Sequence, residues 1–124
     1  MPQTEPIVFV VDDEEVIAKT LALILSGSGF YAKSFTDPLM VLQEAQKMEP
    51  NLLVSDVAMP GMSGIDLAIE MKRLRPKCKT LLFSGQASTA DLLEKARRDG
   101  HDFVLLQKPV HPTDLLREIR SSTE

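Results

Sequence analysis

The sequence has little of several features that mark particular classes of protein. Its 124 residues include one cysteine, no tryptophan and only 5% aromatic residues. Because Cys78 is the single cysteine, the chain cannot form an internal disulfide. Cys78 lies beside a predicted strand, and we assign it no functional role. The longest apolar runs are five residues, well short of the roughly 20 that a membrane span needs. The first six residues lack the charge and apolar core of a signal peptide. We therefore expect a cytoplasmic protein with no membrane association.

The sequence also lacks an excess of positive charge. It carries 14 basic and 18 acidic residues, for a formal net charge of -4 at pH 7. Without a global basic field we expect no direct nucleic-acid binding. Basic residues do gather at 72–79, but the helix dipole favours them at the end of a helix, and we interpret them as a solvated face. Length and composition are typical of one globular domain, which we expect to cover residues 1–124 with no effector domain present.

Short apolar runs alternate with stretches of helical periodicity five times along the chain. This alternation predicts a parallel sheet with helices on both faces. The second run is the most polar and is expected at the sheet edge. The fold class is therefore α/β, a doubly wound, flavodoxin-like, five-stranded parallel sheet in the order 2-1-3-4-5 with five helices. The predicted strands are 7–11, 30–35, 52–56, 80–83 and 103–106, and the helices begin near Glu14, Asp37, Ser63, Ser88 and Pro112.

Polar residues end four of these apolar runs: Asp12 and Asp13, then Asp56, Ser84 and Lys108. A single Asp at a strand end often only binds nearby backbone amides. Here, however, parallel strands bring all five residues to one edge, with the first and third strands adjacent. Two like charges about 4 Å apart repel by about 4 kcal/mol at an effective dielectric of 20, and a few carboxylates plus water suit Mg²⁺. With a lysine and a hydroxyl nearby, the pattern predicts a phosphoryl site in which Asp56 is the nucleophile.

These residues lie in segments that resemble the response-regulator receiver domains of two-component signalling. The resemblance extends from Ile7 to about Ser121. It implies that Asp56 accepts a phosphoryl group from a phosphohistidine on a sensor histidine kinase or a histidine phosphotransfer protein. The domain would then change conformation and control a downstream effector protein or domain. The matching segments are Val10–Glu14, Asp56–Gly64, Phe83–Gly85 and Lys108–Pro109.

The resemblance also implies a metal site. Asp13 and Asp56 would bind Mg²⁺ directly, and the backbone carbonyl of Ala58 would be a third ligand. Asp12 would contribute through water. On this interpretation the domain is not an enzyme acting on other molecules, since it catalyses only its own phosphorylation and dephosphorylation.

Further roles carried over from the family concern the fourth and fifth strands. Lys108 would pair with a phosphoryl oxygen, with a cis peptide bond expected before Pro109. Ser84 would move to another oxygen and begin the conformational change. The family usually has Tyr or Phe three residues before the lysine, where this chain has Leu105. Phe103 has the same parity but lies about 6.6 Å further along the strand. We therefore expect output through the loop after Ser84 and the fourth helix.

Two other functions share part of this pattern. A phosphatase of the haloacid-dehalogenase type also uses an Asp nucleophile with Mg²⁺, but that family has a second Asp two residues later, where this chain has Ala58. A receiver-like interaction module that acts without phosphorylation is the third interpretation; the five site residues argue against it, whereas Leu105 leaves it open. A phosphorylation-dependent homodimer is an expectation from the family alone.

Overall fold

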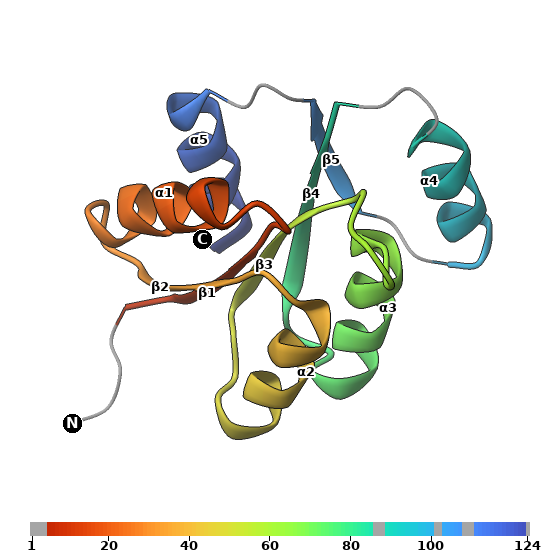
Figure 1. Cartoon of the computed structure of the whole chain (residues 1–124), viewed down its shortest axis with the longest axis horizontal. Coiled ribbons are helices and arrows are strands. Elements are labelled where there is room, and N and C mark those ends of the chain that lie inside the picture. Colours follow the sequence, from red (N-terminus) through yellow and green to blue (C-terminus); the bar gives the residue numbers. More distant parts are fainter. Residues whose placement is uncertain (1–4, 86–88, 101–102, 108–110, 124) are drawn as a thin grey trace.

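A parallel five-stranded sheet organises the chain (Figure 1). The computed structural model describes residues 5–85, 89–100, 103–107 and 111–123. The strand order is β2-β1-β3-β4-β5, as predicted, and the polar strand lies at an edge. The strands are β1 (Ile7–Val11), β2 (Tyr31–Phe35), β3 (Leu52–Asp56), β4 (Lys79–Ser84) and β5 (Val104–Gln107).

Helices cover both faces of this sheet. Helices α1 and α5 lie on one side, and α2, α3 and α4 lie on the other (Figure 1). Along β1, Val8 and Val10 face the first side while Phe9 and Val11 face the second. Burial on both faces explains why the central strands read as continuous apolar runs. The helices are α1 (Glu15–Ser26), α2 (Pro38–Lys47), α3 (Gly64–Leu74), α4 (Thr89–Arg98) and α5 (Pro112–Thr123).

Two helices on the second face begin at the predicted residues, and the side chains of these residues cap them. The side chain of Asp37 accepts a hydrogen bond from the backbone N–H of Leu39 at 2.9 Å, and Pro38 occupies the first turn. Ser63 caps α3 by accepting from the N–H of Asp66 at 3.1 Å. These bonds satisfy amides that the helix itself leaves unpaired. The cap at Ser63 matters for function because it fixes where α3 meets the end of β3.

The structure departs from the prediction in details of the later elements. Strand β5 begins at Val104, one residue later than predicted, because its ladder with β4 starts at the pair Leu81 and Val104. In α4, the sequence pattern predicts that Leu92, Leu93 and Ala96 are buried. Ala96 is buried, whereas the side chains of Leu92 and Leu93 lie outside those that the structure describes. Across the described ranges, every helix is too short or too polar to cross a membrane.

Candidate phosphoryl-transfer site

Asp56 is the last residue of the central strand. All five residues of β3 are buried, and Asp56 is only 5% exposed. Strand β1 flanks β3 on one side, and β4 flanks it on the other, where Asp56 pairs with Phe83. The N–H of Val57 then donates to the carbonyl of Phe83 at 3.1 Å. Asp56 therefore lies on a rigid part of the sheet, at the edge where ligands bind in open parallel sheets.

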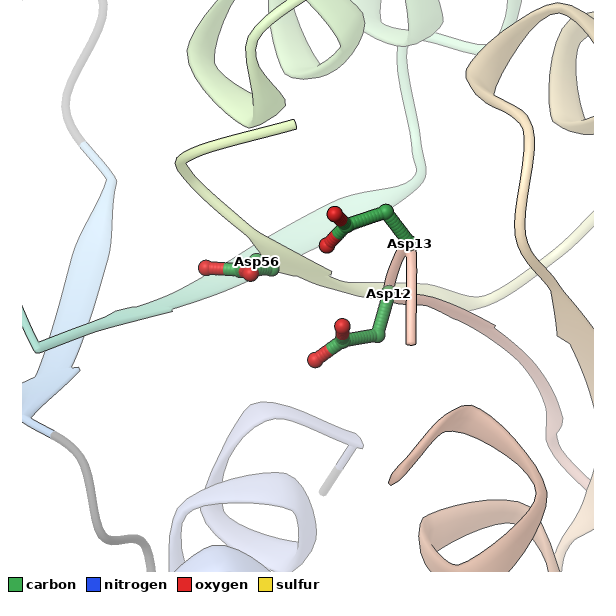
Figure 2. Close-up of side chains that lie close together, drawn as sticks. All are labelled: Asp12, Asp13 and Asp56. Carbon is green, nitrogen blue, oxygen red and sulfur yellow. The ribbon is translucent and has the colours of Figure 1, made fainter. Parts of the chain in front are cut away.

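Three carboxylates meet at this edge. Asp12 and Asp13 directly follow β1, and one ligand oxygen from each of them and from Asp56 lies within 4.8 Å of the other two. Figure 2 shows both side chains extending from the end of β1 toward Asp56. Asp12 is fully buried, whereas Asp13 is exposed. The cluster is thus buried on the side of Asp12 and open to solvent on the side of Asp13.

A tight turn presents the two neighbouring acids to the cluster. The N–H of Asp12 donates to the carbonyl of Phe35 at 3.1 Å, which extends the pairing with β2 beyond the end of β1. The N–H of Glu14 then donates to Oδ1 of Asp12 at 2.9 Å. A side chain that accepts from a backbone amide two residues on is an Asx turn. This turn ends the strand and begins α1 one residue after Glu14.

The remaining predicted site residues lie on β4, on the loop after β3 and after β5. Ser84 ends β4 and is 4% exposed. It lies one residue beyond the partner of Asp56 on the neighbouring strand. Ala58 is exposed on the loop that follows β3. Lys108 and Pro109 lie outside the described residues, although the last residue of β5, Gln107, pairs with Ser84.

The donor set fits a hard divalent cation. Three carboxylates whose oxygens lie within 4.8 Å of one another repel strongly when they are ionised and poorly screened. Hard cations such as Mg²⁺ prefer carboxylate, carbonyl and water oxygens over nitrogen or sulfur. Asp12, Asp13 and Asp56 offer only oxygen, and Ala58, an exposed residue nearby in sequence, has a backbone carbonyl oxygen to add. The residues present therefore suit the magnesium site predicted from the sequence.

The sequence analysis assigned no role to two residues that contact the backbone carbonyl of Asp56. The hydroxyl of Ser55 donates to the backbone carbonyl of Asp56 at 2.9 Å. Gly64 packs so closely that a Cβ at this position would lie 2.1 Å from the same carbonyl oxygen. The available signals were a polar residue inside an apolar strand and a glycine directly after a helix cap. Neither signal says which backbone atom the residue contacts.

Comparison with known proteins assigns the family. The family model described as "Response regulator receiver domain" matches residues 8–120. The chain belongs to this family. The receiver domain is 31% identical over 114 residues to the transcriptional regulatory protein CreB of Escherichia coli K12, covering 92% of this chain and 49% of CreB. It is 29% identical over 121 residues to FixJ of Rhizobium meliloti, covering 98% of this chain and 58% of FixJ. The chain thus spans about half the length of these two regulators.

Solved structures share its fold. A receiver domain protein from Methanospirillum hungatei JF-1, described as CheY-like, superimposes with a TM-score of 0.87 at 25% identity, covering 97% of this chain and 94% of that one. The chemotaxis protein CheY4 of Vibrio cholerae has a TM-score of 0.85 at 23% identity, covering 96% and 99%, and supports the fold alone. The chain is thus a receiver domain homologous to response regulators of two-component signalling. A phosphorylation-independent role is not favoured.

The receiver domain carries Leu105 where the family resemblance leads us to expect an aromatic ring. Leu105 pairs with Leu82 across the sheet. It is partly buried and packs against the same apolar cluster as Phe103, which confirms that the two side chains share a face. The cluster joins Val57, next to Asp56, to Ala96 on α4. This packing is compatible with output through α4, which stays a prediction.

Proposed function

We propose that Asp56 accepts a phosphoryl group from a phosphohistidine on a sensor histidine kinase or a histidine phosphotransfer protein, in the presence of Mg²⁺. The single observation that carries this proposal is the meeting of Asp12, Asp13 and Asp56 within 4.8 Å at the carboxyl ends of β1 and β3. Membership of the receiver family supports the same function.

The proposed transfer is a displacement at phosphorus. A carboxylate oxygen of Asp56 forms a bond to phosphorus while the bond between phosphorus and the imidazole nitrogen breaks. The released imidazole takes a proton from solvent, and Asp56 becomes an acyl phosphate. A bound magnesium ion would offset the negative charge that the phosphoryl oxygens bring to the acidic cluster.

The residues around Asp56 would hold the reacting groups. Asp13 and Asp56 would bind the ion directly, with the carbonyl of Ala58 as a third ligand, and Asp12 would act through water. Ser84 is buried at the end of the neighbouring strand, where its hydroxyl would donate to one phosphoryl oxygen. Lys108 would balance the charge of another.

Phosphorylation is proposed to alter the conformation of the domain and so control a downstream effector protein or domain. We propose that the domain acts in the cytoplasm and catalyses only its own phosphorylation and dephosphorylation. A homodimer that depends on phosphorylation stays a prediction from the family.

Intact mass spectrometry tests the proposal directly. The protein is incubated with acetyl phosphate, with and without Mg²⁺, as wild type and as Asp56→Asn. We expect a metal-dependent gain of one phosphoryl group on the wild type, removed by hydroxylamine as an acyl phosphate would be, and no such gain on Asp56→Asn. The matched control is Asp66→Asn, the same change at an exposed acid in the first turn of α3, which should be phosphorylated like the wild type.

The opposite results distinguish the remaining functions. If the wild type gains no phosphoryl group and binds no beryllofluoride with Mg²⁺, the interaction module that acts without phosphorylation replaces the proposal. If the protein instead hydrolyses many equivalents of an unrelated phosphate ester, the phosphatase interpretation replaces it.

A further inference from the structure

We propose that Ser55 is a positioning residue for the phosphoacceptor. Its buried hydroxyl holds the backbone carbonyl of Asp56, and Gly64 at the start of α3 packs on the same carbonyl. This inference rests on the proposed phosphoryl transfer to Asp56 and adds the device that orients the reacting carboxylate.

Ser55 is the one polar residue before Asp56 in a strand of otherwise apolar side chains. It is fully buried, with Val11 of β1 on one side and Leu82 of β4 on the other. A hydroxyl at such a position is unfavourable unless it makes a hydrogen bond. The bond it makes goes to the carbonyl of Asp56 at 2.9 Å. The hydroxyl therefore acts on the peptide group of the phosphoacceptor itself.

Gly64 brings the first turn of α3 against this same peptide group. A Cβ built on Gly64 would lie 2.1 Å from the carbonyl oxygen of Asp56, 2.9 Å from its carbonyl carbon and 3.0 Å from Oγ of Ser55. The N–H of Gly64 also donates to the carbonyl of Val57 at 2.8 Å. The Asp56 carbonyl is thus enclosed by the Ser55 hydroxyl and by a helix that approaches closely because it begins with glycine.

This contact matters because the direction of the Asp56 side chain depends on the backbone torsions on both sides of its Cα. The ladder with β4 holds the strand before it. After it, the N–H of Val57 still donates to the carbonyl of Phe83 on β4 at 3.1 Å, and the Ser55 hydroxyl holds the carbonyl of the same peptide. The N–H of Gly64 holds the carbonyl of Val57, one peptide further along. Phosphoryl transfer requires the attacking oxygen to be placed within fractions of an ångström. Loss of the hydroxyl should therefore slow transfer more than it disturbs the fold.

Ser55→Thr and Ser55→Val form the decisive pair. Threonine and valine have nearly the same shape, and both add a methyl group at this buried position, but only threonine keeps the hydroxyl. Ser55→Ala removes an atom instead of adding bulk, so it supplies the comparison if valine proves too large for folding. The matched control is Ser28→Ala, which deletes a hydroxyl that donates to the carbonyl of Ile24 at 2.8 Å near the end of α1.

Each variant is incubated with acetyl phosphate and saturating Mg²⁺, and the rate of adduct formation is followed by intact mass across acetyl phosphate concentrations. Calorimetry gives the Mg²⁺ affinity, and thermal unfolding gives the midpoint. We expect the maximal rate to fall about tenfold in Ser55→Val and Ser55→Ala, since small misplacements of reacting groups cost one to two orders of magnitude. The maximal rate of Ser55→Thr should stay within about threefold of wild type on the same reasoning. The maximal rate of Ser28→Ala should equal that of the wild type.

Equal maximal rates in Ser55→Thr and Ser55→Val, or an unchanged maximal rate in a destabilised Ser55→Ala, would overturn the inference and reduce Ser55 to a structural role. Failure of the proposed function gives a different result, because the wild type itself would then gain no phosphoryl group. Adduct on the wild type with no difference among the Ser55 variants refutes only the positioning role.

Discussion

The close approach of Gly64 to Asp56 makes Gly64→Ala the most informative single substitution for stability. The added Cβ would lie 2.1 Å from the Asp56 carbonyl oxygen, where ordinary contacts begin at 3.4 Å. The two atoms must therefore separate by more than 1 Å. Strand β3 is central and fully buried, so we expect the first turn of α3 to move away from it.

The size of the effect follows from what that movement disturbs. Overpacking a close-packed site costs about 1–3 kcal/mol, and weakening the bond from Gly64 N–H to the Val57 carbonyl costs about 1 kcal/mol. The better helix propensity of alanine recovers at most about 1 kcal/mol. We expect a net loss of about 2–3 kcal/mol in the free energy of unfolding. For a chain of 124 residues this lowers the melting temperature by about 10 °C.

Urea unfolding of Gly64→Ala and of a matched Gly27→Ala measures the effect. Gly27 follows α1 with a helical φ of -77°, and a Cβ there would meet its nearest atom, the carbonyl of Leu23, at 3.5 Å. Its substitution should leave stability within about 0.5 kcal/mol of wild type or raise it slightly. If the two variants have the same free energy of unfolding and the same slope of that energy against urea concentration, the close packing of α3 on Asp56 is refuted.

Two further predictions concern charge. In a chelator, Asp13→Asn should raise the free energy of unfolding by about 1 kcal/mol, because it removes an exposed, partly screened charge from a cluster whose oxygens lie within 4.8 Å of one another. Adding Mg²⁺ should make the wild type the more stable of the two proteins, and a variant less stable than the wild type in the chelator would contradict the repulsion. Burial raises the pKa of the Cys78 thiol from 9.0 to about 12, so the unfolded thiol ionises first and stability is lost as the pH rises from 9 toward 12. Cys78→Val should show a shallower loss of urea midpoint between pH 8 and pH 10, and identical slopes would refute the assignment.

Local sequence was sufficient to predict the type and order of the elements, with strand ends within one residue of those observed. The apolar run Leu52–Asp56 became a strand buried on both faces, because a fully buried strand needs no alternation of side-chain polarity. Asp37 and Ser63 became helix caps, because their short oxygen-bearing side chains reach the first free amides of the helix. The carboxyl-end position of Asp56 followed from the parallel arrangement alone.

Other features depended on contacts between distant segments. The one-residue displacement of β5 arises from its register with β4, with Leu81 opposite Val104, and no local signal in a short apolar run specifies that register. Leu74 continued the apolar spacing of α3 but lies at its end and is 38% exposed. Periodicity indicates a helix face without saying how far the neighbouring elements cover it.

The sequence by itself determined the fold class and the chemical kinds of residue at the acidic edge. It did so because strand and helix patterns, caps and turn residues act over a few positions of the chain. Only the tertiary structure decided that Asp12, Asp13 and Asp56 come within 4.8 Å of one another, and that Ser55 and Gly64 enclose the Asp56 carbonyl. These distances arise from strand pairing and from the packing of α3 on β3, and such contacts leave no periodic trace in the sequence.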